Sequence, residues 1–358
     1  MNISIISFSA RGYELSENLA HTLSNTNGKA KYHVTWERCR PGKLHNWTCE
    51  NFSRDALIFI GSCGIAVRAI APFVKSKVSD PAVIVMDERG KYCISLLSGH
   101  IGGANRLVRI LAELTGAEPV ITTATDLNNL FSVDEWASSQ GMKIINPGNI
   151  VKTADKILNG ETIFLKSLVP VGGPVPPNVE YYYSKPFSPD YMEKNDEAKG
   201  SVKEDPDVLV SWKTCPGKDI LHIVPPVLVM GVGCRKGTSE MKIQEAFYKA
   251  CIKENIQPES LSMVCSIDLK KNEAGLINFC SSHGLTLTCY SSQDLSKVHG
   301  NFPSSKFVSE TTGVDNVCQR SAALACGSSH SIIMEKTVID GITLSFGIKP
   351  MEFSFDYQ

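Results

Sequence analysis

The chain has 358 residues, of which 42% are hydrophobic and 20% charged, so a sizeable core is expected and global disorder is excluded. Its formal net charge is −1, which argues against nucleic acid or an anionic membrane surface as a partner. No stretch approaches the roughly 18 uninterrupted apolar residues of a membrane span. The twelve cysteines include no C-x-x-C pair, and the sequence as a whole predicts a reduced, cytoplasmic protein.

The first part of the chain, residues 1–145, alternates strand-like and helix-like segments. Strands are predicted at 3–9, 56–60, 81–87, 91–97 and 119–126, and helices at 12–23 and 104–116. The strands at 81–87 and 91–97 are predicted to form a hairpin, because only a short Glu-Arg-Gly segment separates them. Alternation of this kind is typical of an α/β domain with a mainly parallel sheet.

Residues 146–226 differ in composition and are predicted to form a smaller middle domain or connector. They contain the run PVGGPVPP and, at 192–207, a charged stretch that is interpreted as a solvated loop. Strand–helix alternation resumes at 227 with the strand VLVMGVG. The predicted fold class is therefore α/β. Two α/β domains with mainly parallel sheets, 1–145 and 227–358, are joined by a smaller middle α/β domain.

Several predicted strands end in small polar segments: GSCG at 61–64, SGHIGG at 98–103, TTATD at 122–126 and GVGCRKGTS at 231–239. In open α/β sheets, ligands bind outside the carboxyl ends of the strands, and glycine lets the backbone approach a ligand. Basic residues lie beside three of these turns, which suits a ligand with several carboxylates or phosphates. The predicted substrate-binding residues are Gly64, Arg68, Ser98, Gly99, Gly102, Gly103, Arg106, Thr122, Thr123, Gly233, Arg235, Lys236 and Thr238. The alternative is that these are ordinary turns in which glycine is required by geometry.

His100 lies between glycines, directly after a predicted strand. The ordinary imidazole pKa of about 6.5 suits proton transfer near neutrality. The unpaired amides of the following helix should disfavour the imidazolium. His100 is therefore the predicted general base or acid, with Asp87 or Asp126 as its orienting group or as a second base. The alternative is a histidine that only hydrogen-bonds a neighbouring loop, and Asp134 and Glu135 are interpreted as the charged first turn of a helix.

Several motifs together resemble the CbiG family of anaerobic cobalamin biosynthesis, the cobalt-precorrin-5A hydrolases. They include GIAVRAIAPF at 64–73, ISLLSGHIGGANRL at 94–107, SVDEWA at 132–137, GVGCRKGTS at 231–239 and ETTGVDNVCQRSAAL at 310–324. The last two look like the C-terminal domain of that family, which is similar to the small cobalamin-pathway protein CobE. The segment 227–358 is therefore expected to be a CobE-like domain.

The resemblance implies hydrolysis of a carbon–carbon bond. The family opens the δ-lactone of cobalt-precorrin-5A and releases acetaldehyde, which leaves cobalt-precorrin-5B. The expected small-molecule partner is then a cobalt corrinoid with several carboxylates. Because cobalt arrives with this substrate, no cofactor and no protein-held metal are expected. A homodimer and transient contacts with other enzymes of the pathway are the protein partners considered, and the active cleft is expected between the two larger α/β domains.

Two other functions remain open at this point. A non-catalytic corrinoid carrier of the same pathway would bind the substrate and release no acetaldehyde. An anion- or nucleotide-binding α/β enzyme unrelated to tetrapyrroles is the second alternative. GVGCRKGTS departs from the phosphate-loop pattern, however, because its lysine precedes the last glycine instead of following it.

Overall fold

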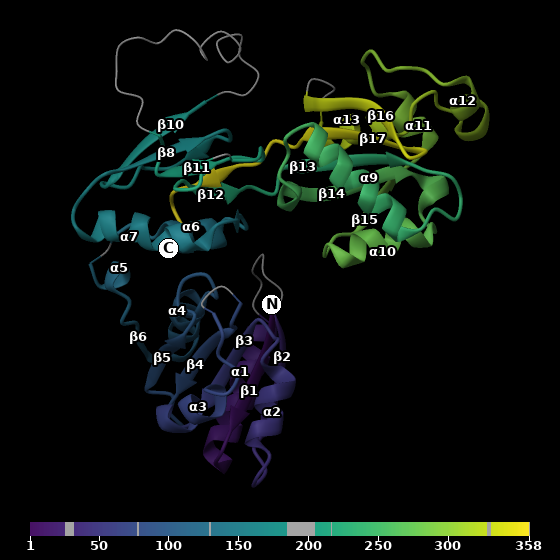
Figure 1. The fold of residues 1–358 in the computed structure, drawn as a ribbon. Coiled ribbons are helices and arrows are strands. Elements are labelled where there is room, and N and C mark those ends of the chain that lie inside the picture. Colours follow the sequence, from purple (N-terminus) through teal and green to yellow (C-terminus); the bar gives the residue numbers. More distant parts are fainter. Residues whose placement is uncertain are drawn as a thin grey trace.

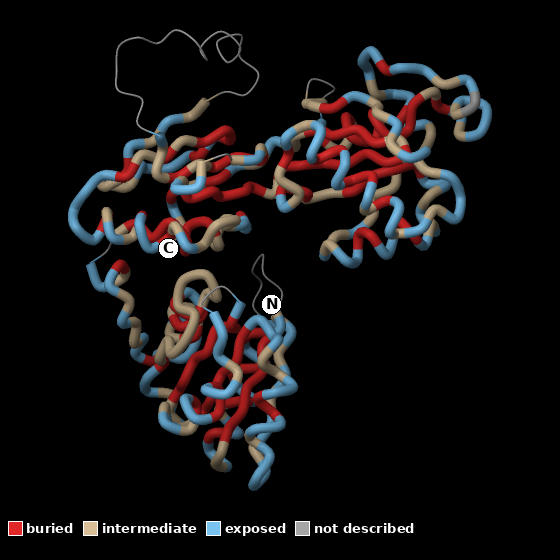
Figure 2. Tube along the Cα trace, viewed as in Figure 1, coloured by how far each residue is buried: buried red, intermediate tan, exposed pale blue. Residues whose placement is uncertain are grey.

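The computed structural model describes residues 1–25, 32–76, 79–128, 130–184, 205–215, 217–327 and 331–357. Three α/β units follow one another along the chain, and each is built on its own sheet (Figure 1). Most strand pairs are parallel, which confirms the predicted α/β class with mainly parallel sheets. Many of the buried residues lie in these strands (Figure 2). The charged stretch predicted at 192–207 lies almost entirely outside the described residues.

The N-terminal unit is a six-stranded sheet with the order β2-β1-β3-β4-β5-β6. Its strands are β1 (Asn2–Ser7), β2 (His33–Arg38), β3 (Ala56–Ile60), β4 (Ala82–Met86), β5 (Tyr92–Leu97) and β6 (Glu118–Val120). Its helices are α1 (Ala10–Ser24), α2 (Leu44–Asn51), α3 (Cys63–Ile70), α4 (Ala104–Thr115) and α5 (Ala124–Leu127). One core forms under α1 and α4 and another under α2 and α3. Because helices cover both faces, β3 and β4 are fully buried and continuously apolar.

Strand direction divides the loops of this unit between two edges of the sheet. The strands β1, β2, β3 and β4 are parallel. The predicted hairpin then reverses the chain, so β5 runs antiparallel to β4, and β6 runs parallel to β5. The loops after β3 and β4 therefore lie at the edge opposite the loops after β5 and β6. The segments 61–64 and 98–103 consequently do not meet at one edge.

The middle unit is a five-stranded sheet with α6 and α7 packed against it. Its elements are α6 (Val133–Ser139), β7 (Lys143–Ile144), η1 (Pro147–Asn149), α7 (Ile150–Leu158), β8 (Ile163–Ser167), β9 (Val171–Gly172), β10 (Val179–Tyr183), β11 (Val208–Val210) and β12 (Leu221–Val224). Its core includes Trp136 of α6 and also Phe353 and Phe355, because β18 (Phe353–Ser354) pairs with β9. The packing thus extends beyond the predicted range of 146–226 at both ends.

The C-terminal unit is a five-stranded mixed sheet with the order β15-β14-β13-β17-β16. Its strands are β13 (Leu228–Gly233), β14 (Leu261–Ile267), β15 (Leu287–Tyr290), β16 (Ile332–Ile339) and β17 (Ile342–Ile348). Its helices are α9 (Glu240–Lys253), η2 (Pro258–Ser260), η3 (Asp268–Lys270), α10 (Ala274–Ser282), α11 (Ser292–Ser296), α12 (Lys306–Thr312) and α13 (Cys318–Cys326). Helices α9 and α10 cover one face, and α13 covers the other.

Gly231→Ala is expected to destabilise this unit. A Cβ added at Gly231 would lie 1.8 Å from the backbone carbonyl oxygen of Cys318, so α13 and β13 would have to move apart. Overpacking of this kind costs about 1–3 kcal/mol, and denaturant unfolding followed by circular dichroism measures it. Gly148→Ala is the control, because a Cβ at that position meets no heavy atom within 4 Å. An equal loss of stability in both variants would contradict the close-packing argument.

The structure differs from the sequence prediction at the end of the N-terminal sheet. The strand predicted at 119–126 ends at Val120, and α5 begins at Ala124. Thr123 takes an extended conformation there, and its carbonyl oxygen accepts the first helical hydrogen bond, from Leu127. The elements β2 and α2 were not predicted. Within the described ranges, no helix combines the length and the apolar character that crossing a membrane requires.

Candidate active site

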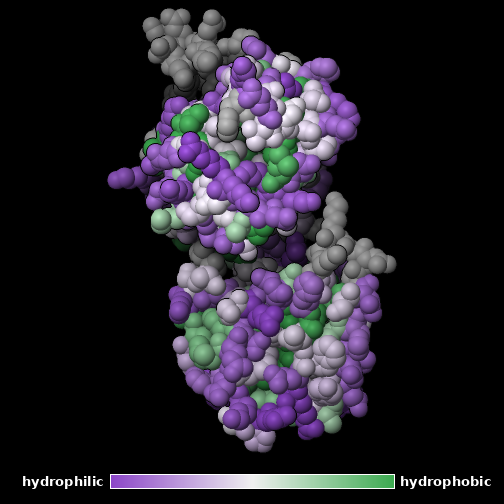
Figure 3. Space-filling view, turned by 90° about the vertical axis from the view of Figure 1, so that its right-hand side faces the viewer, coloured by the Kyte–Doolittle hydropathy of each residue, from purple (hydrophilic) through white to green (hydrophobic). Residues whose placement is uncertain are grey.

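A cavity of about 140 Å³ lies between the N-terminal unit and α6 of the middle unit. Its walls come from the loop that carries His100, from α4, from α6, and from Tyr357 near the C-terminus. In Figure 1, α4 lies at the edge of the N-terminal unit that faces α6 of the middle unit, and Figure 3 shows the molecule narrowing between these two units. The cavity is therefore bounded by segments that are distant in sequence.

Close backbone packing holds the loop that carries His100. Ser98 has a φ of 56°, and a Cβ at Gly102 would lie 2.4 Å from the Cβ of Ser98. A Cβ at Gly99 would lie 2.6 Å from Oδ1 of Asn105, a buried side chain of α4. Glycine is therefore required at both positions by the shape of the turn, which is the alternative that the sequence had left open.

The backbone amides of Gly102 and Gly103, two of the predicted substrate-binding residues, are only partly available to a ligand. The N–H of Gly103 donates to the carbonyl oxygen of His100 at 2.8 Å, which closes the turn before α4. The amide of Gly103 is therefore not a donor to a ligand, because this turn already uses it. The amide of Gly102 stays a candidate, since Gly102 lines the cavity.

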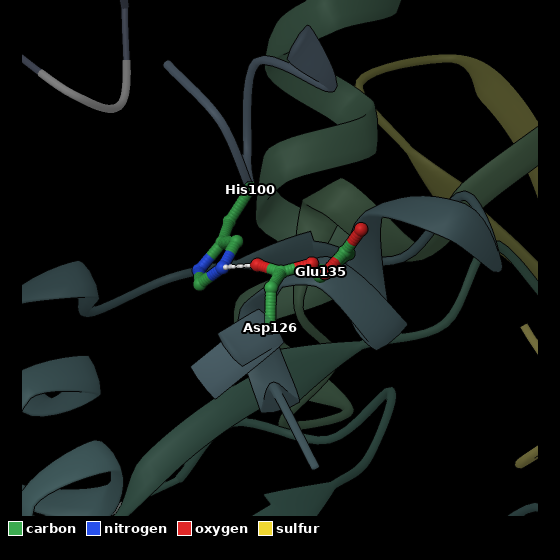
Figure 4. Close-up of side chains that lie close together, drawn as sticks. All are labelled: His100, Asp126 and Glu135. Atoms are coloured by element: carbon green, nitrogen blue, oxygen red, sulfur yellow. Dashed lines mark hydrogen bonds and ion pairs between the residues drawn. The ribbon is translucent and has the colours of Figure 1, made fainter. Parts of the chain in front are cut away.

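His100 points into a cluster of acidic side chains (Figure 4). Its Nε2 lies 3.1 Å from Oδ2 of Asp126, and its Nδ1 lies 3.4 Å from Oδ2 of Asp134. The hydroxyl of Ser132 lies 3.2 Å from Nδ1 and donates to Oδ1 of Asp134 at 2.8 Å. Each nitrogen of the ring thus faces a carboxylate, which is the arrangement that an imidazolium requires.

Two side chains of α4 fix Asp126. Nδ2 of Asn105 donates to Oδ2 of Asp126 at 2.9 Å, and the guanidinium of Arg109 forms an ion pair with Oδ1. Asn105 also accepts a hydrogen bond from Ser95 of β5 at 2.7 Å, which ties α4 to the sheet. Arg109 extends further to Oε1 of Glu135 at 3.3 Å. Helix α4 therefore connects the acidic groups of α5 and α6.

The surroundings keep His100 protonated near neutral pH. Burial alone would lower the pKa of the imidazole, but the hydrogen bonds to Asp126 and Asp134 outweigh it and raise the pKa from 6.5 to about 10. Burial would likewise raise the pKa of both carboxyls, yet hydrogen bonds with His100, Thr123 and Arg109 lower the pKa of Asp126 to about 2, and His100 and Ser132 lower that of Asp134. The prediction of a neutral histidine is wrong, because two buried carboxylates outweigh the helix amides.

Glu135 is the acidic group whose pKa moves toward neutrality. Burial raises the pKa of this carboxyl, and the charge of Asp126 raises it further, while His100 and Arg109 lower it. Glu135 is 9% exposed and lines the cavity. A carboxylate with a raised pKa inside a cavity is a candidate general base.

Asp87 lies at the edge of the sheet opposite His100. Its carboxylate accepts hydrogen bonds from the amides of the β4–β5 turn, at 2.9 Å from Arg89 and 2.6 Å from Tyr92. The role predicted for Asp87 as the partner of His100 is therefore corrected. Asp126 takes that place, and Asp87 stabilises the hairpin turn.

The other predicted binding residues are divided among three places. The cavity and its supporting turn contain Ser98, Gly99, Gly102, Gly103 and Arg106. Thr123 accepts a hydrogen bond from Asn105 at 2.8 Å beside them, and its neighbour Thr122 is exposed. Gly64 and Arg68 lie at the opposite edge of the sheet, where Nη1 of Arg68 donates to the carbonyl oxygen of Gly64 at 3.1 Å.

The remaining predicted residues, Gly233, Arg235, Lys236 and Thr238, lie at the end of β13 and in the loop before α9. Thr238 donates to the carbonyl oxygen of Arg235 at 2.8 Å. None of the described residues that line the cavity comes from this loop. This cavity lies between the first and second units, and the expected cleft between the first and third units stays a prediction.

Sequence reasoning missed several functional groups of the site: Asn105, Arg109, Ser132, Tyr357 and the acidic pair Asp134–Glu135. Asp134 and Glu135 do form the first turn of α6, as predicted, but both are buried. The available signal was Trp136, a large apolar residue that directly follows two acidic ones. A buried tryptophan at that position indicates that the start of the helix faces a core.

His100, Asp126 and Glu135 also have the spacing of a metal site. Each offers one ligand atom, and these atoms lie within 4.8 Å of one another. The guanidinium of Arg109 already pairs with both carboxylates, and a metal would require a neutral imidazole. The arrangement therefore favours a protonated acid–base cluster. The expectation of no protein-held metal stays a prediction.

Comparison with known proteins adds independent information. Residues 47–126 match the family model described as cobalamin synthesis G N-terminal, and residues 228–347 match the one described as cobalamin synthesis G C-terminus. The chain is 35% identical over 303 residues to cobalt-precorrin-5A hydrolase of Salmonella typhimurium, which covers 82% of each chain. It is 33% identical over 306 residues to the enzyme of the same name from Priestia megaterium, which covers 84% of this chain and 80% of that protein.

One solved structure is that of CobE, a protein from the cobalamin (vitamin B12) biosynthetic pathway. CobE is 19% identical to this chain. The aligned region covers 34% of this chain and 89% of CobE, with a TM-score of 0.30. At that score the superposition adds nothing to the assignment, so the CobE-like character of residues 227–358 stays a prediction.

The fold and the site define an enzyme of several α/β units with a buried acid–base cluster in a cavity between two of them. The two matched segments cover more than half of the chain, and two curated relatives exceed 30% identity over most of it. The chain belongs to the cobalamin synthesis G (CbiG) family and is a hydrolase of cobalamin biosynthesis. The alternative of a non-catalytic carrier is not favoured, because the relatives are named as hydrolases.

Proposed function

We propose that this protein opens the δ-lactone of cobalt-precorrin-5A and releases acetaldehyde, which leaves cobalt-precorrin-5B in anaerobic cobalamin biosynthesis. The observation that carries the proposal is the pair His100 and Glu135, whose polar atoms lie within 4.8 Å of each other in one cavity. Family membership supports the substrate, and the acid–base pair supports its hydrolysis.

The cavity accepts only part of such a substrate. Pockets for drug-sized ligands measure about 300–1,000 Å³, whereas this cavity measures about 140 Å³. We therefore expect the lactone-bearing edge to enter, and the cobalt-containing ring to remain outside. Cobalt belongs to the substrate, so we expect the protein itself to bind no cofactor.

In the first step, water adds to the lactone carbonyl. Glu135 takes a proton from this water, which its raised pKa favours. The imidazolium of His100 stabilises the oxyanion and then protonates the departing oxygen, so the products are a carboxyl group and a hydroxyl group. The acid and the base are close enough to act on one reacting centre.

In the second step, the new hydroxyl loses its proton and the carbon–carbon bond breaks in a retro-aldol sense. His100 is neutral after the first step, so it can take this proton and return to the form that Asp126 and Asp134 stabilise. The electron pair of the broken bond passes to the conjugated tetrapyrrole, and the two-carbon fragment leaves as acetaldehyde. One histidine thus acts first as an acid and then as a base.

The direct test incubates the purified protein with cobalt-precorrin-5A and assays acetaldehyde and the opened corrinoid. We expect both products to appear in equal amounts. Binding of the corrinoid without release of acetaldehyde would instead indicate a carrier. Opening of the lactone without acetaldehyde would limit the activity to the first step.

Arg106→Gln is expected to weaken binding of the substrate about tenfold, which corresponds to about 1.4 kcal/mol. Arg106 is exposed on α4 and lines the cavity, so its guanidinium can pair with a carboxylate of the entering edge. The effect should be larger at low salt than at high salt. Arg68→Gln is the matched control, because Arg68 lies at the opposite edge of the sheet. Equal affinities of the Arg106 variant and the wild type would contradict this role.

A further inference from the structure

Tyr357, near the end of the chain, reaches the same cavity as His100 and Glu135. Its hydroxyl oxygen accepts a hydrogen bond from the backbone N–H of Ser132 at 3.1 Å. That bond uses an oxygen lone pair, and no hydrogen bond among the described residues uses the hydroxyl proton. The hydroxyl of Tyr357 can therefore still donate one hydrogen bond.

The segment before Tyr357 is anchored to the helix that carries Glu135. Nε1 of Trp136 donates to the carbonyl oxygen of Ser354 at 2.8 Å. The ring of Phe355 stacks on that of Trp136 with centroids 5.4 Å apart. Because Trp136 directly follows Glu135 in α6, these contacts hold the segment before Tyr357 against the helix that carries the carboxylate. The position of Tyr357 is therefore supported by packing of the preceding residues against α6.

We propose that the phenol of Tyr357 is a catalytic hydrogen-bond donor to the lactone carbonyl oxygen, which becomes the oxyanion when water adds. The inference rests on the proposed function and extends it to a residue from the far end of the chain. The amide of Gly103 is engaged in the turn before α4, which leaves the imidazolium of His100 and the amide of Gly102 as the other donors that the oxyanion could have. Burial raises the pKa of Tyr357 to about 12, and nearby carboxylates raise it too, so the phenol keeps its proton throughout the neutral range.

Tyr357→Phe tests the proposal, because it removes the hydroxyl and keeps the ring that packs against Phe131 with centroids 6.0 Å apart. We expect kcat for acetaldehyde release to fall about 10²–10³-fold, the usual effect of removing one oxyanion donor. Binding of cobalt-precorrin-5A, measured by rapid-mixing absorbance before turnover, should weaken about two- to tenfold. Tyr182→Phe is the control, because Tyr182 is 53% exposed on β10, and it should change neither quantity.

Unchanged turnover and unchanged affinity in Tyr357→Phe would overturn the proposal. A loss of turnover together with a lower pKa of His100, measured by ¹⁵N NMR, would also overturn it, since Tyr357 would then act through Ser132 and not on the substrate. A wild-type protein that binds the corrinoid and releases no acetaldehyde would contradict the proposed function alone. In that case the affinities of the wild type and of Tyr357→Phe for cobalt-precorrin-5A can still be compared. Weaker binding by the variant would support contact between Tyr357 and the substrate, and equal binding would contradict it.

Discussion

Glu135→Gln should reduce acetaldehyde release by about 10²–10⁴-fold, the usual contribution of a positioned general base. The amide has the size of the carboxylate, but it cannot take a proton from water. Its carbonyl oxygen can still accept the hydrogen bond from Arg109, which lies 3.3 Å from Oε1. We therefore expect the fold and the affinity for the corrinoid to be retained while kcat falls. A coupled assay for acetaldehyde, together with an absorbance titration of the corrinoid, separates the two quantities.

Glu113→Gln is the matched control for this variant, because Glu113 is exposed on α4 in the same part of the molecule. It should keep full turnover. If Glu135→Gln also keeps near-full turnover, another group activates the water, and the base is not on α6.

The pH dependence of the reaction rate tests the roles of Glu135 as base and His100 as acid. The base must be ionised, so kcat/KM should rise with pH through the pKa of Glu135, which lies above its ordinary value of 4.5. The acid must be protonated, so kcat/KM should fall as pH rises through the pKa of His100 at about 10. Glu135→Gln should remove the acidic limb and keep the alkaline one. A profile whose alkaline limb falls near pH 6.5 would contradict the protonated form of His100.

His100→Asn should also reduce acetaldehyde release by about 10²–10⁴-fold. Asparagine retains some hydrogen bonding, but it neither gives nor takes a proton. Loss of the imidazolium also removes the positive charge that His100 holds against Asp126 and Asp134, so the pKa of both carboxyls should rise. The measurement is kcat for acetaldehyde over pH 6–9, on protein whose folded state is verified by circular dichroism.

His45→Asn serves as the comparison for this substitution, because His45 is exposed on α2 and lies outside the cavity. It should leave turnover unchanged. Near-full turnover in His100→Asn would reduce His100 to a residue that orders its loop and would pass proton transfer to Asp126 or Glu135. Equal losses in both variants would indicate a general effect on the protein.

The sequence predicted the α/β class because the buried strands are continuous apolar runs, such as 56–60 and 81–87. It also predicted the hairpin between β4 and β5. The consequence of that hairpin was missed: it reverses β5 and β6, so the glycine-rich segments at 61–64 and 98–103 lie at opposite edges. Strand direction, and not the composition of the turns, decides which loops meet. Arg68 and Asp87 were predicted to be site residues only because each lies at or just after the end of a predicted strand.

The site itself could be predicted only in part. His100 and Asp126 were identified from their places after strands, and the structure joins them at 3.1 Å. The charge state of His100 could not be predicted, because it depends on Asp134, which a helix of another unit brings to the ring. Tyr357 illustrates the same limit, since it is separated from His100 by most of the chain. Contacts of this kind arise from packing between units and leave no periodic pattern in the sequence.

The proposed acid–base mechanism depends on a charged His100 in the folded protein, and a ¹⁵N NMR titration of histidine-labelled protein measures this charge. The His100 resonances, assigned by their loss in His100→Asn, should report an imidazolium at pH 7 and titrate near pH 10. In Asp126→Asn the pKa of His100 should fall, because one of the two carboxylates that raise it is gone. A neutral His100 at pH 7 in the wild-type protein would rule out the proposed mechanism, since the acid of the first step would then be absent.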